Sequence, residues 1–232
     1  MTAPLLTEFQ VKQLSRHFET REVDELLEWA VARFAPRLVM TSSFGAEGVV
    51  LIDKLSMIAP RTPVIYLDTG FQFKETDELK AQLRERYDLN IIEARAKLSV
   101  AEQSIVYGER LFAREPDQCC RLRKVEPLRE ALRGQNAWIA ALRRDQSPTR
   151  AGIGIIEWNA QHQLIKIHPL ARWSRKEVWK YIVENDLPYN RLYDEGYASI
   201  GCEPCTRPVA ITAHERSGRW QGTGKLECGI HA

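Results

Sequence analysis

The sequence predicts an α/β fold in which a mostly parallel five-stranded sheet is flanked by helices. Twice near the beginning, at residues 37–59 and 63–87, a short apolar run leads through a turn of small residues into a helical pattern. Three more short apolar runs, at 90–94, 137–142 and 164–167, alternate with helical stretches, which is typical of parallel sheets. A chain of 232 residues that is 44% hydrophobic can bury a sizeable core.

Residues 7–35 are predicted to be helical, because apolar residues recur there at helical spacing and Pro36 ends the run. A strand at 37–40 then enters the small-residue turn 41–48, and a helix follows. Such a turn can hold a phosphate, since the N–H groups and dipole at a helix N-terminus attract an anion. A plain capping turn explains this segment equally well.

The second strand, residues 63–67, ends in Asp68-Thr69-Gly70 before the next helix. In open parallel sheets ligands bind beyond the carboxyl ends of the strands, so both turns are placed to share one ligand. Further along, Ser174 and Glu177 form a capping box that opens another helix.

The chain has no internal repeat, low-complexity segment or convincing linker. We therefore expect one domain over residues 1–220, which includes a C-terminal extension from about residue 171. Residues 221–232 are expected to form a flexible tail. That tail carries the lone cysteine Cys228 behind the permissive Gly222 and Gly224.

A net charge of +2 argues against a polybasic nucleic-acid partner, although cations can still gather around a small anion. No apolar run approaches the roughly 18 residues of a membrane span, and residues 1–4 begin no signal peptide. We expect a cytoplasmic protein without a membrane partner. A homo-oligomer is left open.

Two basic segments stand out. The run 119–124 is expected at a helix start, where its three cations form a solvated face unless Lys124 points toward a metal centre or an anion. Arg143 and Arg144 follow the fourth strand, at the same edge as the serine turn. The planar arginine fork suits sulfate and phosphate, whereas Arg144 with Asp145 can also be a surface pair of little consequence.

The five cysteines are Cys119, Cys120, Cys202, Cys205 and Cys228. Neighbouring Cα atoms lie about 3.8 Å apart, below the roughly 4.4 Å that a relaxed disulfide needs, so the vicinal pair is unsuited to bridging itself. A Cys-x-x-Cys turn alone fits a redox motif, a zinc half-site or an iron–sulfur half-site. A thioredoxin-like redox motif belongs beside an early strand and helix, so the position of this Cys-x-x-Cys argues against it. Zinc sites usually combine two Cys-x-x-Cys pairs that lie close together in the sequence, which makes zinc atypical here but leaves it open.

Six motifs, spread over nearly the whole chain, together resemble one family, the assimilatory adenylyl-sulfate reductases within the phosphoadenylyl/adenylyl-sulfate reductase group. The motifs are Ser42-Ser43-Phe44-Gly45-Ala46-Glu47, Leu67-Asp68-Thr69-Gly70, Cys119-Cys120 with Arg123-Lys124, Leu142-Arg143-Arg144-Asp145-Gln146-Ser147, Cys202-x-x-Cys205 and Glu227-Cys228-Gly229-Ile230-His231. The resemblance implies an adenine-nucleotide α-hydrolase-like fold with a modified pyrophosphate loop. Gly48 departs from the pattern, since an acidic residue often stands there.

The resemblance also implies a cofactor, a nucleophile and a substrate. Cys119, Cys120, Cys202 and Cys205 would ligate one [4Fe–4S] cluster. Cys228 would attack the sulfur of adenylyl sulfate, expel AMP and become an S-sulfocysteine, which thioredoxin resolves to sulfite in assimilatory sulfate reduction. The residues implied for substrate binding are Ser42, Ser43, Gly45, Glu47, Leu67, Thr69, Gly70, Lys124, Arg143, Arg216, Arg219 and His231.

Two physical considerations agree with this interpretation. Sulfuryl transfer from a phosphosulfate needs a nucleophile and cations that offset charge on the oxygens. If four thiols hold a cluster, no resolving cysteine remains to attack modified Cys228, so the second thiol must come from an external dithiol protein.

Three alternatives remain. The enzyme could use the 3′-phosphorylated nucleotide instead, although the complete cysteine quartet favours adenylyl sulfate. The chain could be a non-catalytic nucleotide-binding iron–sulfur redox sensor that uses Cys228 for partner disulfides. The quartet could hold a structural zinc ion.

Overall fold

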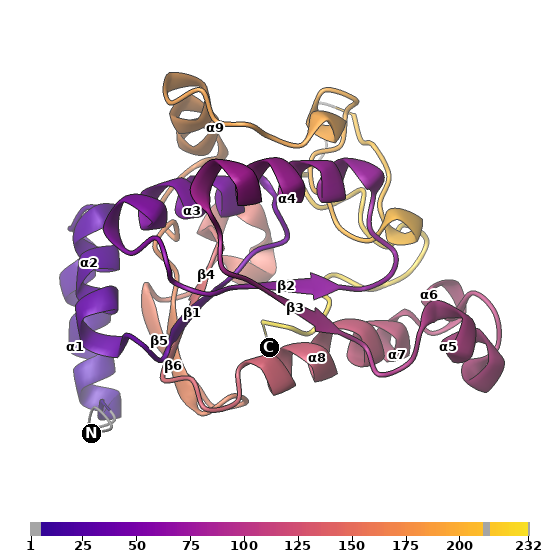
Figure 1. Ribbon diagram of the computed structural model, residues 1–232, viewed down its shortest axis with the longest axis horizontal. Coiled ribbons are helices and arrows are strands. Elements are labelled where there is room, and N and C mark those ends of the chain that lie inside the picture. The colour runs from indigo at the N-terminus through magenta and orange to yellow at the C-terminus, as the bar shows by residue number, and fades with distance from the viewer. Residues whose placement is uncertain (1–5, 211–213, 232) are drawn as a thin grey trace.

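A six-stranded sheet runs through the centre of the computed structural model, which describes residues 6–210 and 214–231 (Figure 1). The strand order is β3-β2-β1-β4-β6-β5, and every pair is parallel except β5 with β6. The strands are β1 Leu38–Thr41, β2 Val64–Asp68, β3 Ile91–Arg95, β4 Ala137–Ala140, β5 Ile156–Asn159 and β6 Leu164–Ile167.

The predicted α/β architecture is confirmed, but the count of five strands was wrong. The missed strand is β5, which pairs antiparallel with β6 at the edge of the sheet. Two of its four residues, Glu157 and Asn159, are polar, so the segment lacks the apolar run that marks a buried parallel strand.

Helices cover both faces of the sheet. They are α1 Glu8–Phe18, α2 Val23–Phe34, α3 Ala46–Ile58, α4 Lys74–Tyr87, α5 Val100–Tyr107, α6 Leu111–Arg114, α7 Pro116–Cys120, α8 Glu126–Ala131 and α9 Arg175–Glu184. Figure 1 shows α3 and α4 on one side of the sheet and α8 on the other. None of the helices within the described ranges is long and apolar enough to cross a membrane.

The helix expected over residues 7–35 is in fact two helices. Thr7 and Gln10 form a capping box at the start of α1. Glu22 caps α2, so the helical conformation is interrupted at residues 19–22. The capping box predicted for Ser174 and Glu177 is confirmed at the start of α9.

Successive side chains of the central strands point alternately into two apolar clusters, one on each face of the sheet. Residues such as Met40 and Ile139 face a large core formed with α2, α3, α4 and α9. Val39 and Trp138 face a smaller cluster that includes Leu128 of α8, and Ile230 of the C-terminal tail packs against this cluster. The tail therefore lies on the α8 side of the sheet.

The run 119–124 does not open a helix as expected but lies inside a longer helical stretch. Cys119 and Cys120 end α7, a π-helical turn follows at Arg121–Val125, and α8 continues from it. Such π-turns are often found at functional sites.

Candidate functional site

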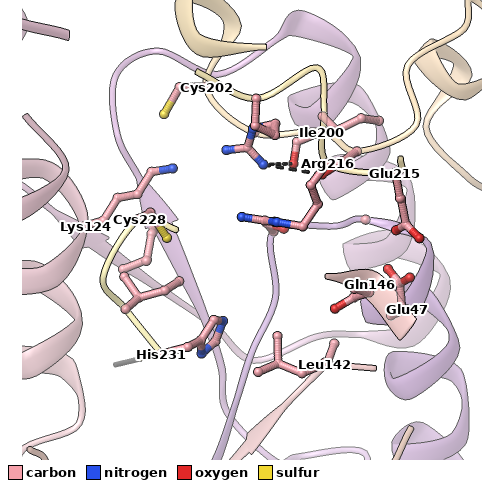
Figure 2. A pocket seen from close by; sticks show the side chains of 18 of the residues that line it. Glu47, Lys124, Leu142, Gln146, Ile200, Cys202, Glu215, Arg216, Cys228 and His231 are labelled. Atoms are coloured by element: carbon pink, nitrogen blue, oxygen red, sulfur yellow. Dashed lines mark hydrogen bonds between the residues drawn. The ribbon is translucent and has the colours of Figure 1, made fainter. Parts of the chain in front are cut away.

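A cavity of about 170 Å³ opens at the carboxyl edge of the sheet, where the strand order reverses between β1 and β4. Ligands bind at this switch point in open α/β sheets, because the loops after the two central strands diverge there. Its lining residues come from the loops after β1, β2 and β4, from β2 and α3, from the π-helical turn that carries Lys124, from residues 193–202 and 215–220, and from the C-terminal tail (Figure 2). Ten of the residues predicted for substrate binding or nucleophilic attack line it, namely Ser43, Gly45, Glu47, Leu67, Thr69, Lys124, Arg216, Arg219, Cys228 and His231.

The turn after β1 presents the N-terminus of α3 to the cavity. Phe44 adopts a left-handed conformation (φ 56°), and its N–H donates to Ser42 Oγ at 3.0 Å. Ser42 is therefore buried behind the turn and does not line the cavity, while Ser43 and Gly45 do. A Cβ atom at Gly48 in α3 would lie 2.6 Å from Ser42 Oγ, so a side chain at this position would displace the hydroxyl that accepts from the Phe44 N–H.

Arg143 lies behind the cavity wall. Its side chain is fully buried and donates to Glu47 at 2.8 Å, to Glu215 at 2.7 Å and to Asp145. Glu47 and Glu215 line the cavity, so Arg143 holds two lining carboxylates instead of facing a ligand itself. Burial and the nearby Glu47 raise the pKa of Glu215.

The loop after β2 is positioned by Arg123. Its Nε donates to the Thr69 carbonyl, and its Nη1 donates to the Leu98 carbonyl at 3.2 Å. Gly70 lies against this guanidinium with φ 69°, and a Cβ atom there would be 3.0 Å from Nη2. Gly70 thus shapes the loop but does not line the cavity, whereas Leu67 and Thr69 do.

Lys124 points into the cavity from the side of α8. In Figure 2 its ammonium group lies near both Cys202 and Cys228. Burial by itself would lower the pKa of Lys124, but interaction with Cys202 and Cys228 raises it overall. Despite burial, Lys124 lowers the pKa of Cys202, whose sulfur also lies 3.4 Å from Thr69 Oγ1.

Three arginines, Arg150, Arg216 and Arg219, complete a basic wall. Burial and repulsion from Arg150 and Arg219 lower the pKa of Arg216 to about 10. The Nε atoms of Arg216 and Arg219 are buried without a hydrogen-bond partner among the described residues. Crowded cations with unmet donors form a site for an anionic ligand.

Cys228 lines the cavity from the tail and is partly exposed. Its neighbour Glu227 is held by Arg150 and Arg216 at 2.9 and 3.0 Å. Further back, Lys225 pairs with Asp117. The tail segment 225–231 is therefore docked onto the body of the protein.

His231 reaches the cavity but also packs against the sheet. Its ring stacks on Trp138 with centroids 5.4 Å apart and planes 18° apart. Burial, together with Lys166 and Arg150, lowers the pKa of His231 well below its usual value. The ring is therefore neutral near pH 7, and its buried Nδ1 has no hydrogen-bond partner among the described residues.

The other four cysteines lie beside the cavity on its α7 side. Cys119, Cys120, Cys202 and Cys205 are free thiols that line one small neighbouring pocket, and Cys202 and Lys124 line both spaces. Burial raises the pKa of Cys119 to about 11 and that of Cys120 to about 12. Within residues 6–210 and 214–231, no three or more Cys, His, Asp or Glu side chains are grouped closely enough to hold one metal ion.

Several lining residues were not predicted from the sequence, including Gln146, Arg150, Tyr193 and Glu215. Arg150 offered a signal, because it belongs to the same strand-end loop as Arg143. Tyr193 offered none: it comes from a 3-10 turn, Arg191–Tyr193, and its hydroxyl accepts from the Ala46 N–H at 3.1 Å, which caps α3.

Comparison with known proteins agrees with the sequence resemblance. Residues 37–208 match the phosphoadenosine phosphosulfate reductase domain. The chain is 49% identical over 225 residues to a protein of Gloeobacter violaceus named phosphoadenosine 5′-phosphosulfate reductase, covering 96% of this chain and 93% of that one. It is 46% identical over 208 residues to a Lysinibacillus sphaericus protein named adenosine 5′-phosphosulfate reductase, covering 89% of each.

A solved structure shares the fold. The phosphoadenylyl-sulfate reductase of Candida auris, crystallised as a phosphate complex, superimposes with a TM-score of 0.80 and 31% identity, over 88% of this chain and 100% of that one. The match over residues 37–208, the relatives and this structure together show that the chain belongs to the phosphoadenosine phosphosulfate reductase family.

Proposed function

We propose that the chain reduces adenylyl sulfate to sulfite and AMP, with Cys228 as the nucleophile. The observation that carries the proposal is the placement of this thiol on a cavity whose walls hold Lys124, Arg216 and Arg219. Two of these cations have buried donors without partners. A phosphosulfate brings the negative oxygens that such donors require.

The nucleotide would lie against the remaining walls. Phosphate oxygens would meet the turn of Ser43 and Gly45 at the N-terminus of α3, a favourable place for an anion. The adenosine would lie along the loop after β2, beside Leu67 and Thr69. This arrangement directs the sulfate toward the basic wall and the thiol.

The first chemical step is sulfuryl transfer. The Cys228 thiolate attacks the sulfur of adenylyl sulfate, the bond from that sulfur to the bridging oxygen breaks, and AMP leaves with the electron pair. The product is a Cys228 S-sulfocysteine. Lys124 and the arginines hold the sulfate oxygens while the charge moves onto AMP.

The second step needs a dithiol. One thiolate of the dithiol attacks Cys228 Sγ, the sulfur–sulfur bond breaks, and sulfite leaves with the pair. The second thiol of the dithiol then displaces Cys228 and forms a disulfide, so two electrons pass to the sulfur that becomes sulfite. Thioredoxin or a similar protein supplies this dithiol, which suits a cytoplasmic location.

We also propose that Cys119, Cys120, Cys202 and Cys205 hold one [4Fe–4S] cluster. Four free thiols around one pocket match its ligand set in kind and number. When bound, the cluster would supply iron–thiolate bonds that join α7 to residues 202–205 and fix Lys124 at the cavity.

Residues 1–220 are proposed to form the body that binds nucleotide and cluster, and residues 221–232 the tail that carries the nucleophile. The tail must leave the cavity, at least in part, for an external dithiol to reach Cys228.

A second substrate deserves a direct comparison, because the Gloeobacter relative is named for the 3′-phosphorylated nucleotide. Sulfite formation should be measured with each nucleotide, thioredoxin and a thioredoxin-reducing system. We expect adenylyl sulfate to be the better substrate and Cys228→Ser to abolish turnover. Preference for the 3′-phosphorylated nucleotide would reassign the substrate, and inactivity of the wild-type holoprotein with both would favour a redox sensor.

A further inference from the structure

The carboxylate of Glu227 lies among hydrogen-bond donors from three other residues. Arg150 donates to it through two nitrogens, from Nε to Oε1 at 3.0 Å and from Nη2 to Oε2 at 2.9 Å. Arg216 Nη2 donates to Oε2 at 3.0 Å, and the Thr149 hydroxyl donates to Oε1 at 3.0 Å. A carboxylate held at both oxygens by a planar fork is fixed in direction as well as position.

Arg150 is itself held by contacts on the side away from Glu227. The Arg150 side chain is 10% exposed, and its Nη1 donates to Gln146 Oε1. The same amide oxygen accepts from the backbone N–H of Arg143 at 3.1 Å. Arg150 is thus held by the loop after β4 as well as by the tail.

A second attachment lies on the other side of Cys228. His231 stacks on Trp138, and its carbonyl accepts from Lys166 Nζ at 3.4 Å. Ile230 packs on the apolar cluster beneath. Cys228 is therefore held between one attachment at the preceding residue and another that begins two residues later.

We propose that Glu227 is a positioning residue, whose carboxylate, bound by Arg150 and Arg216, seats the Cys228 thiol in the cavity for attack. The inference deepens the proposed function and rests on it. It gives Glu227 a role despite its negative charge, which by itself disfavours a neighbouring thiolate. It also means that Arg150 binds the tail and that His231 helps to anchor it.

Positioning and simple electrostatics predict different signs for two variants. If Glu227 seats the tail, then Glu227→Gln and Arg150→Gln both release Cys228. If these residues act only through charge, removing the carboxylate favours the thiolate and removing the guanidinium disfavours it. The two variants would then change thiol reactivity in opposite directions.

The experiment uses anaerobic holoprotein treated with iodoacetamide, and follows alkylation of the Cys228 peptide by mass spectrometry. We expect each single variant to raise the Cys228 rate about tenfold, which corresponds to about 1.4 kcal/mol of lost docking. The alkylation rate of the variant that carries both substitutions should be little higher than that of either single variant, because each substitution removes the same contact. Glu130→Gln is the matched control, since Glu130 forms an exposed pair with Arg133 at 2.9 Å; it should react as the wild type does.

A second readout follows the reaction itself. In a single turnover with adenylyl sulfate and no reductant, Glu227→Gln should sulfonate Cys228 about tenfold more slowly, with little change in the nucleotide concentration that gives half the maximal rate. Unchanged alkylation in both variants, or slower alkylation in Arg150→Gln, would overturn the inference. If the wild type forms no sulfonate with either nucleotide, the proposed function fails, while the alkylation rates still decide whether Glu227 seats the tail.

Discussion

Gly201→Ala tests the basic wall without removing any functional group. A Cβ atom at position 201 would lie 2.1 Å from Nη2 of Arg219 and 2.4 Å from its Cζ. No guanidinium can stay at that distance, so Arg219 must leave its place above the Trp220 ring, where its Cζ lies 4.6 Å from the centroid. The displaced group is the far end of a flexible side chain, so the fold should tolerate the change.

The expected cost follows from the contact that is lost. Hydrogen bonds to charged groups contribute about 1.5–3 kcal/mol, so losing the proposed contact between Arg219 and a sulfate oxygen should lower kcat/KM roughly ten- to 150-fold. Steady-state sulfite formation with thioredoxin measures this. The control is Gly152→Ala, because a Cβ atom at Gly152 meets no atom within 4 Å.

The comparison with Arg219→Ala completes the test. If Gly201→Ala acts by moving Arg219, adding it to Arg219→Ala should cause little further loss. Equal activity in Gly201→Ala and Gly152→Ala, or fully additive losses in the double variant, would refute the role given to Arg219.

Two other predictions concern stability and metal content. Burial lowers the pKa of His168 to about 3, and its Nδ1 lies 2.8 Å from the Gly154 carbonyl, so the folded ring stays neutral while the unfolded one takes up a proton near pH 6.5. The stability that comes from keeping His168 neutral is complete above pH 6.5 and is lost as the pH falls. Urea unfolding should therefore show a free energy of unfolding that is about 2 kcal/mol lower at pH 5 than at pH 7 because of this group. The His168→Gln variant should lack this part of the pH dependence, and a pH dependence identical to that of the wild type would contradict the prediction. Anaerobic wild-type protein should contain about four iron atoms per chain, and Cys205→Ser should contain fewer; a colourless wild type with bound zinc would contradict the cluster.

The parallel core of the fold could be predicted because each buried strand is a short apolar run followed by a turn and a helix. The edge strand β5 was missed because it lacks such a run: Glu157 and Asn159 interrupt its apolar pattern. The break between α1 and α2 was also missed, because the apolar spacing continues across it and the capping residue Glu22 was not recognised in the sequence.

The candidate site could be predicted to the level of its loops but not of every side chain. The sequence indicates which edge of the sheet Arg143 and Arg150 share, yet not that Arg143 turns inward to Glu47 while Arg150 faces the tail. Likewise, Gly70 follows the correct strand, but its role is to let Arg123 approach closely. Which residue reaches the cavity depends on contacts between segments far apart in the chain, and these leave no local pattern.

The central claim is that Cys228 takes the sulfuryl group directly from the nucleotide. The most direct test incubates anaerobic holoprotein with adenylyl sulfate in the absence of any dithiol and maps the product by peptide mass spectrometry. The account predicts the mass of one added SO₃ group on the Cys228 peptide, release of one equivalent of AMP, and neither change in Cys228→Ser. AMP release without a modified Cys228, or a sulfonate on another cysteine, would contradict it.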